Sequence, residues 1–265
     1  MKSYMGMFKM SYKGELQYRA KAFSGVITQF FWGIMYVYLY TSFMGGNLIE
    51  GFSLSQMASY VWLGQAIFAL RYVDLPKNCA KEIENGDVCY KFVRPINLYN
   101  QWYFEYLGYK LSATLLRSPL IIVIALLLPA GIGLMLPVSF TALILFFISL
   151  ILGALIISAI SMIVVFLTFK TVSSKGTLSI VSTITGILGG LFIPLPLMPT
   201  ALQNVLNYLP FRFIADLPLR IYIGSISLSS ALMFIGIAVA WLVALVVLGK
   251  ILLNKALKHT IIQGG

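Results

Sequence analysis

The sequence predicts an all-α membrane protein with six transmembrane helices, an N-terminal interfacial amphipathic helix, and an external re-entrant or short helical segment between spans five and six. Of its 265 residues, 60% are hydrophobic and 10% are charged, whereas soluble domains average roughly 45–50% and 25%. The apolar residues are gathered into runs of about 20, the length that crosses a hydrocarbon core of about 30 Å. We expect one transmembrane domain over residues 1–265.

Residues 1–21 do not form a span, because five cations interrupt them: Lys2, Lys9, Lys13, Arg19 and Lys21. Bulky side chains recur at every fourth position of the same stretch: Tyr4, Phe8, Tyr12 and Leu16. A helix with cations on one face and aromatic residues on another is typical of the membrane interface. The alternative is a short basic tail in the cytoplasm, and we favour the interfacial helix.

Six apolar runs follow, and each predicts one span. The first two spans are predicted at about 22–44 and 54–71, and the other four within 111–136, 140–169, 177–193 and 228–253. The first run is longer than the apolar core of a secretory signal peptide, and no small-residue cleavage site follows it, so we interpret it as a retained span. Residues 72–110, between the second and third runs, are polar and are predicted to form a cytoplasmic loop.

The segment 194–227 is neither charged enough for a soluble loop nor continuous enough for a span. Its prolines each remove a backbone donor and oppose a continuous helix; they are Pro194, Pro196, Pro199, Pro210 and Pro218. In hydrocarbon, such backbone survives only when it is buried in protein or faces water. We therefore predict a short helix over about 200–208, shallow or re-entrant at the outer face.

The cations fix the predicted orientation. Sixteen of the 19 lysines and arginines fall in segments that would lie on one side, and only Arg212 and Arg220 fall on the other. Because short loops rich in Lys and Arg remain in the cytoplasm, both chain ends are predicted to be cytoplasmic. Arg117 lies inside the third apolar run. It either marks a functional site or snorkels to the cytoplasmic headgroups, and we favour snorkelling.

Candidate catalytic groups are sparse. The chain has one histidine, His259, and two cysteines, Cys79 and Cys89, which we expect to be reduced thiols in the cytoplasm. No carboxylate lies deep inside a predicted span, which disfavours transport driven by an ion gradient. The phosphate-binding pattern G-x-x-x-x-G-K-[ST] does not occur, so an ATP-driven activity needs an ATPase on another polypeptide. We predict no enzyme activity, metal or cofactor on this chain.

The predicted cytoplasmic loop contains a candidate site for a partner protein. Acidic and apolar residues surround a glycine there, and an Arg-Pro pair follows. The candidate contact residues are Glu82, Glu84, Gly86, Asp87, Arg94 and Pro95. This composition fits a small helix that docks in the groove of a partner. An ordinary solvated loop is the alternative, and composition alone leaves both open.

Gly186 and Gly190 form a G-x-x-x-G spacing in the fifth apolar run. This spacing lets the backbones of two membrane helices approach closely. We predict that the pair supports helix packing, within the chain or in a dimer.

Together these features resemble the ABC-2 type permeases of bacterial ABC exporters, in particular subunits of about 260 residues that work with a separate ATPase and often a second permease. The resemblance covers nearly the whole chain of 265 residues. It is carried by elements in a fixed order: Glu84-Asn85-Gly86, Arg94-Pro95, Ile193 to Pro199, Leu209-Pro210-Phe211, and Pro218 with Gly224.

The resemblance implies a permease subunit of an ATP-driven exporter in the bacterial cytoplasmic membrane. Residues of about 78–95 would contain the coupling helix that contacts the ATPase. The outer segment would cap the pathway as an external gate, through Pro194, Pro196, Pro199, Pro210, Phe211 and Pro218. The partners implied are two copies of a cytosolic ABC ATPase, which hold ATP and Mg²⁺, and a second permease, either a copy of this chain or a sister subunit.

The spans contain few charged side chains, so an amphipathic or hydrophobic cargo is expected: a drug, a lipid or a peptide. Trp32, Tyr36, Tyr38 and Tyr40 either face a lateral pathway or anchor the chain at the interface. Nucleic acid is not an expected partner, because the cations sort by side of the membrane. Two other functions remain open: a channel or secondary carrier that needs no ATPase, and a membrane scaffold that transports nothing.

Overall fold

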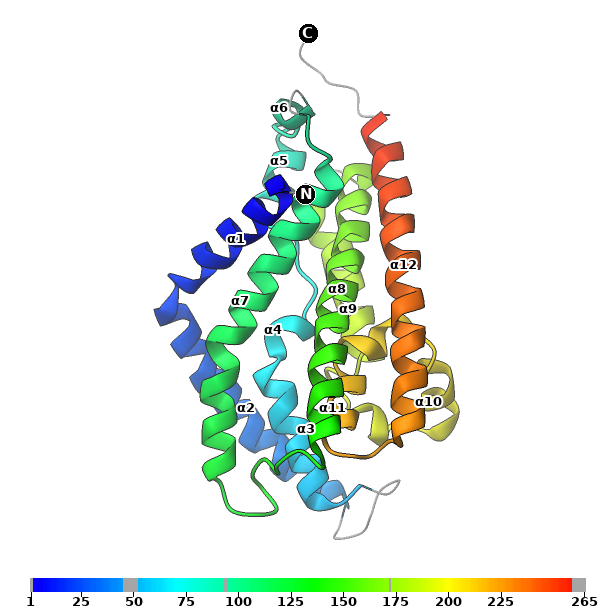
Figure 1. Cartoon of the computed structure of the whole chain (residues 1–265). Helices are drawn as coiled ribbons and strands as arrows, with labels where there is room; N and C mark the ends of the chain where they lie inside the picture. Colours follow the sequence, from blue (N-terminus) through cyan, green and yellow to red (C-terminus); the bar gives the residue numbers. More distant parts are fainter. Residues whose placement is uncertain (1, 45–51, 93–94, 172, 259–265) are drawn as a thin grey trace.

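A computed structural model describes residues 2–44, 52–92, 95–171 and 173–258. Within these ranges the chain folds into helices and contains no β-strand (Figure 1). The longer helices are α1 (Lys2–Leu16), α2 (Arg19–Met44), α3 (Leu54–Ala66), α7 (Leu98–Leu127), α8 (Phe140–Thr171), α9 (Ser174–Leu188) and α12 (Leu228–Lys258). The shorter helices are α4 (Phe68–Arg71), α5 (Cys79–Glu84), α6 (Cys89–Phe92), η1 (Leu195–Leu197), α10 (Thr200–Leu206), η2 (Pro210–Ile214) and α11 (Asp216–Tyr222).

Four of the described helices are long and apolar enough to cross a membrane: α2, α7, α8 and α12. The second and fifth predicted spans are shorter helices of 13 and 15 residues, α3 and α9. The helix after Leu54 breaks at Ile67 and resumes as α4, and α9 stops at Gly189. The described structure therefore supports a helical membrane protein with four candidate spans. It does not by itself confirm the six spans that the sequence predicts.

Helix α7 differs from the predicted third span. It begins at Leu98, inside the stretch that the sequence predicts to be a loop, because the side chain of Asn97 caps it by accepting from the Asn100 backbone N–H at 3.1 Å. It ends at Leu127, and the chain then turns instead of continuing to 136. Backbone groups of this turn bond to α3: Trp62 donates to the Ile132 carbonyl at 2.7 Å, and the Met135 N–H donates to Ser59 at 2.8 Å.

Helix α8 is central to the packing and contacts α7, α9, α11 and α12. Gly153 lets the backbone of η2 approach it, since a Cβ there would lie 2.7 Å from the Ile214 carbonyl oxygen. Between apolar helices in lipid, such close packing replaces the hydrophobic effect as the source of association. Bulky apolar side chains such as Phe31, Phe43 and Leu127 are exposed on the outer helices, as expected where lipid covers the surface.

Helix α1 lies along the first half of α7 (Figure 1). Gly108 permits the approach, because a Cβ there would lie 2.6 Å from the Phe8 carbonyl oxygen. Ser11 donates to the Glu105 carbonyl at 2.7 Å, and the rings of Tyr4 and Phe104 stack at 6.1 Å. Residues 2–16 are thus helical, and their position in a membrane interface stays a prediction.

The segment between α9 and α12, which we call the outer segment after its predicted position, is a series of short helices. Its prolines stand where a helix needs no backbone donor: Pro194 and Pro199 at the N-caps of η1 and α10, Pro196 and Pro210 in the first turns of η1 and η2, and Pro218 in the first turn of α11. Leu195 and Pro196 are buried, as are all the residues of α11 except Arg220. The α11 part of the segment is therefore covered by protein, whereas α10 is largely exposed, as Leu202 and Val205 show.

Candidate coupling site

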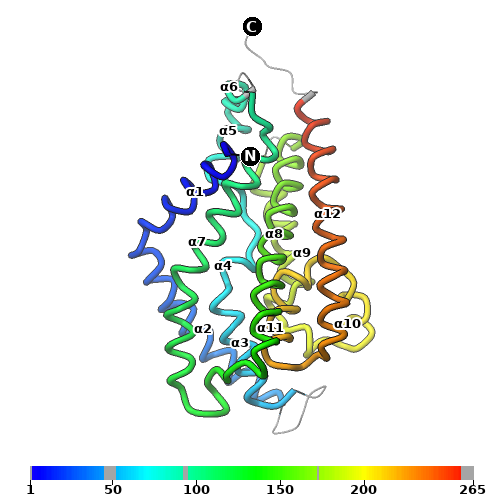
Figure 2. The backbone as a smooth tube through the Cα atoms, in the orientation of Figure 1, coloured from blue at the N-terminus to red at the C-terminus, as the bar shows by residue number. Residues whose placement is uncertain are grey.

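Helices α5 and α6 form a short hairpin at one end of the molecule. The beginning of α1 and the end of α12 lie at the same end, whereas α11 and the start of α3 lie at the other (Figure 1). Residues 72–78 connect α4 to α5 and run along α7 and α8 (Figure 2). The hairpin is thus joined to the helical bundle by an extended connector.

The hairpin is held by one ion pair and two buried anchors. Lys91 and Glu82 form an ion pair at 2.6 Å, which links α6 to α5. Ile83 and Val88 are buried. Gly86 has a φ of 80°, a left-handed conformation that favours glycine, and it reverses the chain between the two helices. Two predicted site residues, Glu82 and Gly86, therefore shape the hairpin itself.

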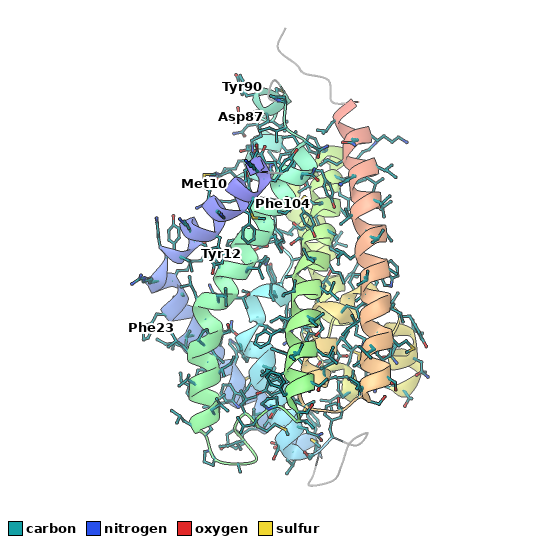
Figure 3. All side chains as sticks on the ribbon, in the orientation of Figure 1. Met10, Tyr12, Phe23, Asp87, Tyr90 and Phe104 are labelled. Atoms are coloured by element: carbon teal, nitrogen blue, oxygen red, sulfur yellow. The ribbon has the colours of Figure 1, made fainter. Side chains whose placement is uncertain are left out.

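The tip of the hairpin points away from the bundle. Asp87 and Tyr90 lie at its outer edge (Figure 3), and Tyr90 is 77% exposed. Pro95 is exposed in the bend that leads to α7, and Arg94 lies outside the described residues. An exposed aromatic ring beside a carboxylate gives this end an apolar and an anionic contact for a protein partner.

Glu84 faces the opposite way, toward the start of α9. Its Oε1 accepts from the Ser174 hydroxyl at 2.7 Å and from the Ser174 backbone N–H at 3.0 Å. Ser173, the N-cap residue, makes no capping bond of its own, so Glu84 supplies the acceptor and the negative charge that a helix N-terminus favours. The hydroxyl bond and then the backbone bond hold the pKa of the Glu84 carboxyl below its ordinary value.

The connector is fixed to the bundle at Asp74. Its carboxylate pairs with the buried ammonium of Lys110 at 2.9 Å, and its carbonyl accepts from Ser161 of α8 at 2.7 Å. The same ammonium donates to the carbonyls of Ala69 and Tyr72 at 2.9 and 2.6 Å. Lys110 therefore caps the C-terminal end of α4, where a cation is favoured.

Arg71 links the end of α4 to the end of α9. Its guanidinium donates to the Gly190 carbonyl, and the side chain is only 8% exposed. Gly64 leaves room for it, because a Cβ there would lie 2.6 Å from Nη1 of Arg71. Helix α9 is consequently held at its start by Glu84 of α5 and just beyond its end by Arg71 of α4.

The structure gives Gly186 and Gly190 a place other than a helix-packing pair. Gly190 lies beyond the end of α9 with a φ of 75°, and Gly189 is the C-cap residue. A Cβ on Gly186 would lie 2.7 Å from the Phe192 ring, which belongs to the chain segment that follows α9. The nearest atoms to a Cβ on either glycine belong to the segment that follows α9, so the two glycines shape the exit from that helix. A packing contact with a second permease stays a prediction.

The outer segment is tied together by a buried carboxylate. Asp216 pairs with Arg212 at 3.0 Å and with Arg220 at 3.4 Å, and it accepts from the Tyr60 hydroxyl at 2.8 Å. Asp216 is fully buried. Arg220 lies four residues after it on the same face of α11, whereas Arg212 reaches it from η2. Phe211 is half-buried beside this network and packs against the main core.

Arg117 lies against the N-terminal part of α2. A Cβ on Gly25 would lie 3.0 Å from its Nε, so the side chain crosses the α2 backbone at a glycine. Gly25 follows Arg19 and Lys21 by a few residues. Arg117 thus sits near the level of other cations, which favours the snorkelling interpretation.

Both cysteines are free thiols, and they flank the hairpin turn. Burial raises the pKa of the Cys79 thiol, which suppresses its reactive thiolate form. Cys89 is half-buried. No cluster of three or more potential metal ligands occurs among the described residues.

Comparison with known families identifies the family of this chain. The family model of ABC-2 family transporter proteins matches residues 26–264. The chain belongs to this ABC-2 transporter family. A comparison with curated proteins gave no match. Family membership confirms the resemblance that the sequence motifs predict and makes the chain a membrane transport subunit, whose ATPase activity resides on a partner.

The sequence pattern missed three of the residues that organise this ABC-2 protein. In the sequence, two of them are ordinary cations at the ends of apolar runs, Arg71 and Lys110. The third, Ser174, is one serine among many. The spacing of Asp216 and Arg220 was a readable signal, since charges four residues apart share a helix face. Nothing local marks Ser174 as the partner of Glu84, because the two are 90 positions apart.

Proposed function

We propose that this chain is the permease subunit of an ATP-driven exporter and that energy enters it through the α5–α6 hairpin. The observation that carries this proposal is the contact of Glu84 with Ser174, which links an exposed hairpin to the first turn of α9. The ATPase is a separate cytosolic ABC subunit, present in two copies, which binds ATP and Mg²⁺. Membership of the ABC-2 family supports a partner of this kind.

In this proposal the exposed side of the hairpin binds the ATPase, and Glu84 at the end of α5 moves α9. Asp87 and Tyr90 provide the exposed contact surface, together with Pro95 and, from sequence resemblance, Arg94. Displacement of the hairpin is carried to the start of α9 by Glu84 and to its end by the connector and Arg71. Because both ends of α9 are tied to the α4–α5 segment, α9 moves with the hairpin and not independently of it.

The far end of α9 leads directly into the outer segment, which we assign as the external gate. Pro194, Pro196 and Pro199 follow the α9 exit, and Pro210, Phe211 and Pro218 flank the network around Asp216. A motion of α9 therefore reaches the backbone of η2, which packs on α8 and α9. We propose that this segment is re-entrant and opens the pathway outward.

The topology that we propose has six membrane crossings, with the hairpin and both chain ends in the cytoplasm. Helices α3 and α4 together cover residues 54–71, or about 27 Å at 1.5 Å per residue, close to the thickness of a bilayer core. Helix α9 and the residues that follow it form the fifth crossing. The position of the hairpin beside the first described residues and the end of α12 supports this arrangement (Figure 1).

A second permease, identical or a sister subunit, completes the pathway in this proposal. Helix α9 packs on α8 along one face, while Ser179 and Thr183 are exposed on the other among exposed isoleucines. Hydroxyl groups on a membrane helix are better matched by another helix than by lipid. The exposed face of α9 is thus the surface that we expect the second permease to cover.

The cargo that we propose is amphipathic or hydrophobic, such as a drug, a lipid or a peptide. Trp32, Tyr36 and Tyr40 stack along one face of α2 with ring centroids 5.6 and 5.5 Å apart. Tyr40 also donates to the Phe192 carbonyl at 3.0 Å, which brings this row of rings to the exit of α9. Aromatic faces with hydroxyl groups bind molecules that are apolar with a few polar atoms.

Reconstitution tests the proposal. The purified chain is placed in liposomes with and without the phosphate-loop ATPase that copurifies with it, and uptake of a fluorescent amphipathic dye is measured with ATP or a non-hydrolysable analogue. The proposal predicts uptake only with both the ATPase and ATP. Equal transport by the chain alone would identify a channel or secondary carrier. If the ATPase binds but no dye is transported either with or without ATP, a membrane scaffold would be favoured.

A further inference from the structure

A groove of mixed charge opens where α1 meets α2. One part of it is a cavity of about 400 Å³ lined by Glu15, Tyr18, Lys21, Asp74, Lys77 and Tyr109, among others. A second cavity of about 320 Å³ shares Glu15, Lys77 and Tyr109 with the first and extends to Glu82, Lys91 and Glu105. Because three side chains line both cavities, the two form one groove between α1, the connector and α7.

We propose that this groove binds the headgroup of a membrane phospholipid that carries a phosphate and a primary ammonium, as phosphatidylethanolamine does. The proposal does not depend on the exporter function. It rests on the balance of charge in the groove, on the side chains that remain without ion partners, and on where the groove opens.

The charges of the groove are balanced. Its carboxylates are Glu15, Asp74, Glu82 and Glu105, and its lysines are Lys21, Lys77 and Lys91. Lys110, which pairs with Asp74 from the bundle side, adds a fourth cation. A ligand with a net charge would therefore meet as much repulsion as attraction, whereas a zwitterion meets a partner for each of its charges.

Two of these charges remain free to bind a ligand. Lys21 pairs with Glu15 at 3.2 Å, Lys91 with Glu82 at 2.6 Å, and Lys110 with Asp74 at 2.9 Å. Among the described residues, Lys77 and Glu105 form no ion pair. Lys77 is exposed, and Glu105 accepts one hydrogen bond from the side-chain amide of Gln101 at 3.0 Å. We assign Lys77 to the phosphate and Glu105 to the ammonium.

The aromatic rings favour a primary ammonium over a quaternary one. A quaternary ammonium needs free aromatic faces, but the Nζ of Lys77 lies 5.2 Å from the centre of the Tyr18 ring, and that of Lys21 lies 5.9 Å from the Tyr109 ring. Those faces already have cations. A primary ammonium, in contrast, donates hydrogen bonds to a carboxylate such as Glu105.

The position of the groove favours a lipid over a solute. Phe23 of α2 is 62% exposed and points outward just beyond the α1–α2 junction, while Met10 of α1, which lines the second cavity, is 68% exposed (Figure 3). The polar groove therefore adjoins a lipid-facing apolar surface. A molecule with acyl chains on that surface would present its headgroup at the groove.

Native mass spectrometry of the full chain tests the site. The chain is reconstituted in nanodiscs that contain equal amounts of phosphatidylethanolamine, phosphatidylcholine and phosphatidylglycerol, and the lipids retained on release are counted. We expect phosphatidylethanolamine to be retained about tenfold over each of the other two, the worth of one charge-assisted hydrogen bond. Equal retention of phosphatidylglycerol or phosphatidylcholine would overturn the proposal.

Variants connect the preference to the groove. Glu105→Gln should abolish most of the preference, because Glu105 is assigned to the ammonium. Lys77→Gln should lower the retention of all three lipids, because each of them carries the phosphate, and Lys77→Arg should keep it. Lys81→Gln is the matched control, because Lys81 is also exposed in this part of the chain but does not line the groove. Since Lys77 is exposed, its substitution leaves the fold intact. Unchanged retention of phosphatidylethanolamine in Lys77→Gln would contradict the proposal even if Glu105→Gln fails to fold.

A soluble headgroup distinguishes the two possible ligands of the groove, a membrane lipid and a water-soluble zwitterion. Glycerophosphoethanolamine, which lacks acyl chains, is titrated against the chain in nanodiscs of phosphatidylcholine alone. We expect it to bind far more weakly than the lipid, because it gains nothing from the apolar surface around Phe23. Binding of the soluble compound as tight as that of the lipid would assign the groove to a water-soluble zwitterion and overturn the lipid proposal.

Discussion

Glu84 in α5 accepts two hydrogen bonds from Ser174, the first residue of α9, although 90 positions separate them. The carboxylate thus replaces the capping side chain that Ser173 does not provide. A helix whose cap belongs to another element responds to the position of that element. This relationship is the physical basis for coupling in the account above.

The first prediction concerns the cap itself. Glu84→Gln keeps the shape of the side chain but removes its charge, and Ser174→Ala removes the hydroxyl donor. Both should weaken the first turn of α9 and raise amide hydrogen exchange there by a few-fold, as measured by mass spectrometry. Asp87→Asn, an equivalent change at the exposed tip, should leave exchange in α9 unchanged. Equal protection in all the variants would show that the contact does not order α9.

The pH dependence of this contact follows from the pKa of Glu84. Because the folded pKa lies below the ordinary value of 4.5, the contact contributes fully above pH 4.5 and is lost as the pH falls through the lower, folded value. Exchange at the start of α9 should therefore be constant from pH 7 to 5, after correction for intrinsic rates, and rise below that range. Glu84→Gln should show no such rise, and an identical pH profile in the variant would contradict the assignment.

A second prediction uses two glycines to test the link through Arg71. A methyl group at Gly64 would lie 2.6 Å from the guanidinium, whereas one at Gly236 of α12 meets nothing within 4 Å. Gly64→Ala should displace Arg71 from the Gly190 carbonyl and lower stability by about 1–3 kcal/mol. Gly236→Ala should have little effect. Thermal unfolding in detergent measures both, and equal melting temperatures would show that the fit around Arg71 is not tight.

The third prediction concerns the outer network. Asp216→Asn would leave the guanidinium groups of Arg212 and Arg220 without their carboxylate in a buried site. Breaking a buried pair in this way costs about 3–5 kcal/mol. Replacing Arg212, Asp216 and Arg220 together by leucine should recover much of the lost stability, because it removes the unpaired charges. A variant Asp216→Asn as stable as the natural chain in detergent would show that water reaches the network.

Thiol labelling tests the hairpin. Cys89 is half-buried, whereas burial both shields the Cys79 thiol and raises its pKa. A membrane-impermeant maleimide should therefore modify Cys89 much faster than Cys79, and only when the cytoplasmic side is accessible. The single-cysteine variants Cys79→Ser and Cys89→Ser report each site separately. Rapid labelling of Cys89 from outside intact cells would invert the proposed topology.

The sequence predicted the helical class and most of the long elements, because composition and the length of apolar runs depend on local residues alone. Its errors came from contacts between distant residues. Residues 98–110 have polar and aromatic character typical of a loop, yet they extend α7 because α1 packs on them and Gly108 permits the approach. Helix α7 therefore begins before residue 111 and ends before residue 136, the limits within which the third span was predicted.

The candidate site was predictable only in part. The glycine turn at Gly86 and the acidic residues near it are local signals, and the hairpin lies where they indicated. A contact of Glu84 with a partner stays a prediction, and the structure adds its contact with Ser174 of the same chain. Local patterns cannot distinguish these outcomes, because both need an exposed carboxylate beside a turn.

The most direct test of the coupling account is the amount of dye transported per ATP hydrolysed by the reconstituted complex, compared between the natural chain and Glu84→Gln at saturating ATPase. We predict that ATPase binding and ATP hydrolysis persist in the variant while transport per ATP falls severalfold. An unchanged ratio, with the variant folded and bound to the ATPase, would contradict the claim that Glu84 carries the motion of the hairpin to α9.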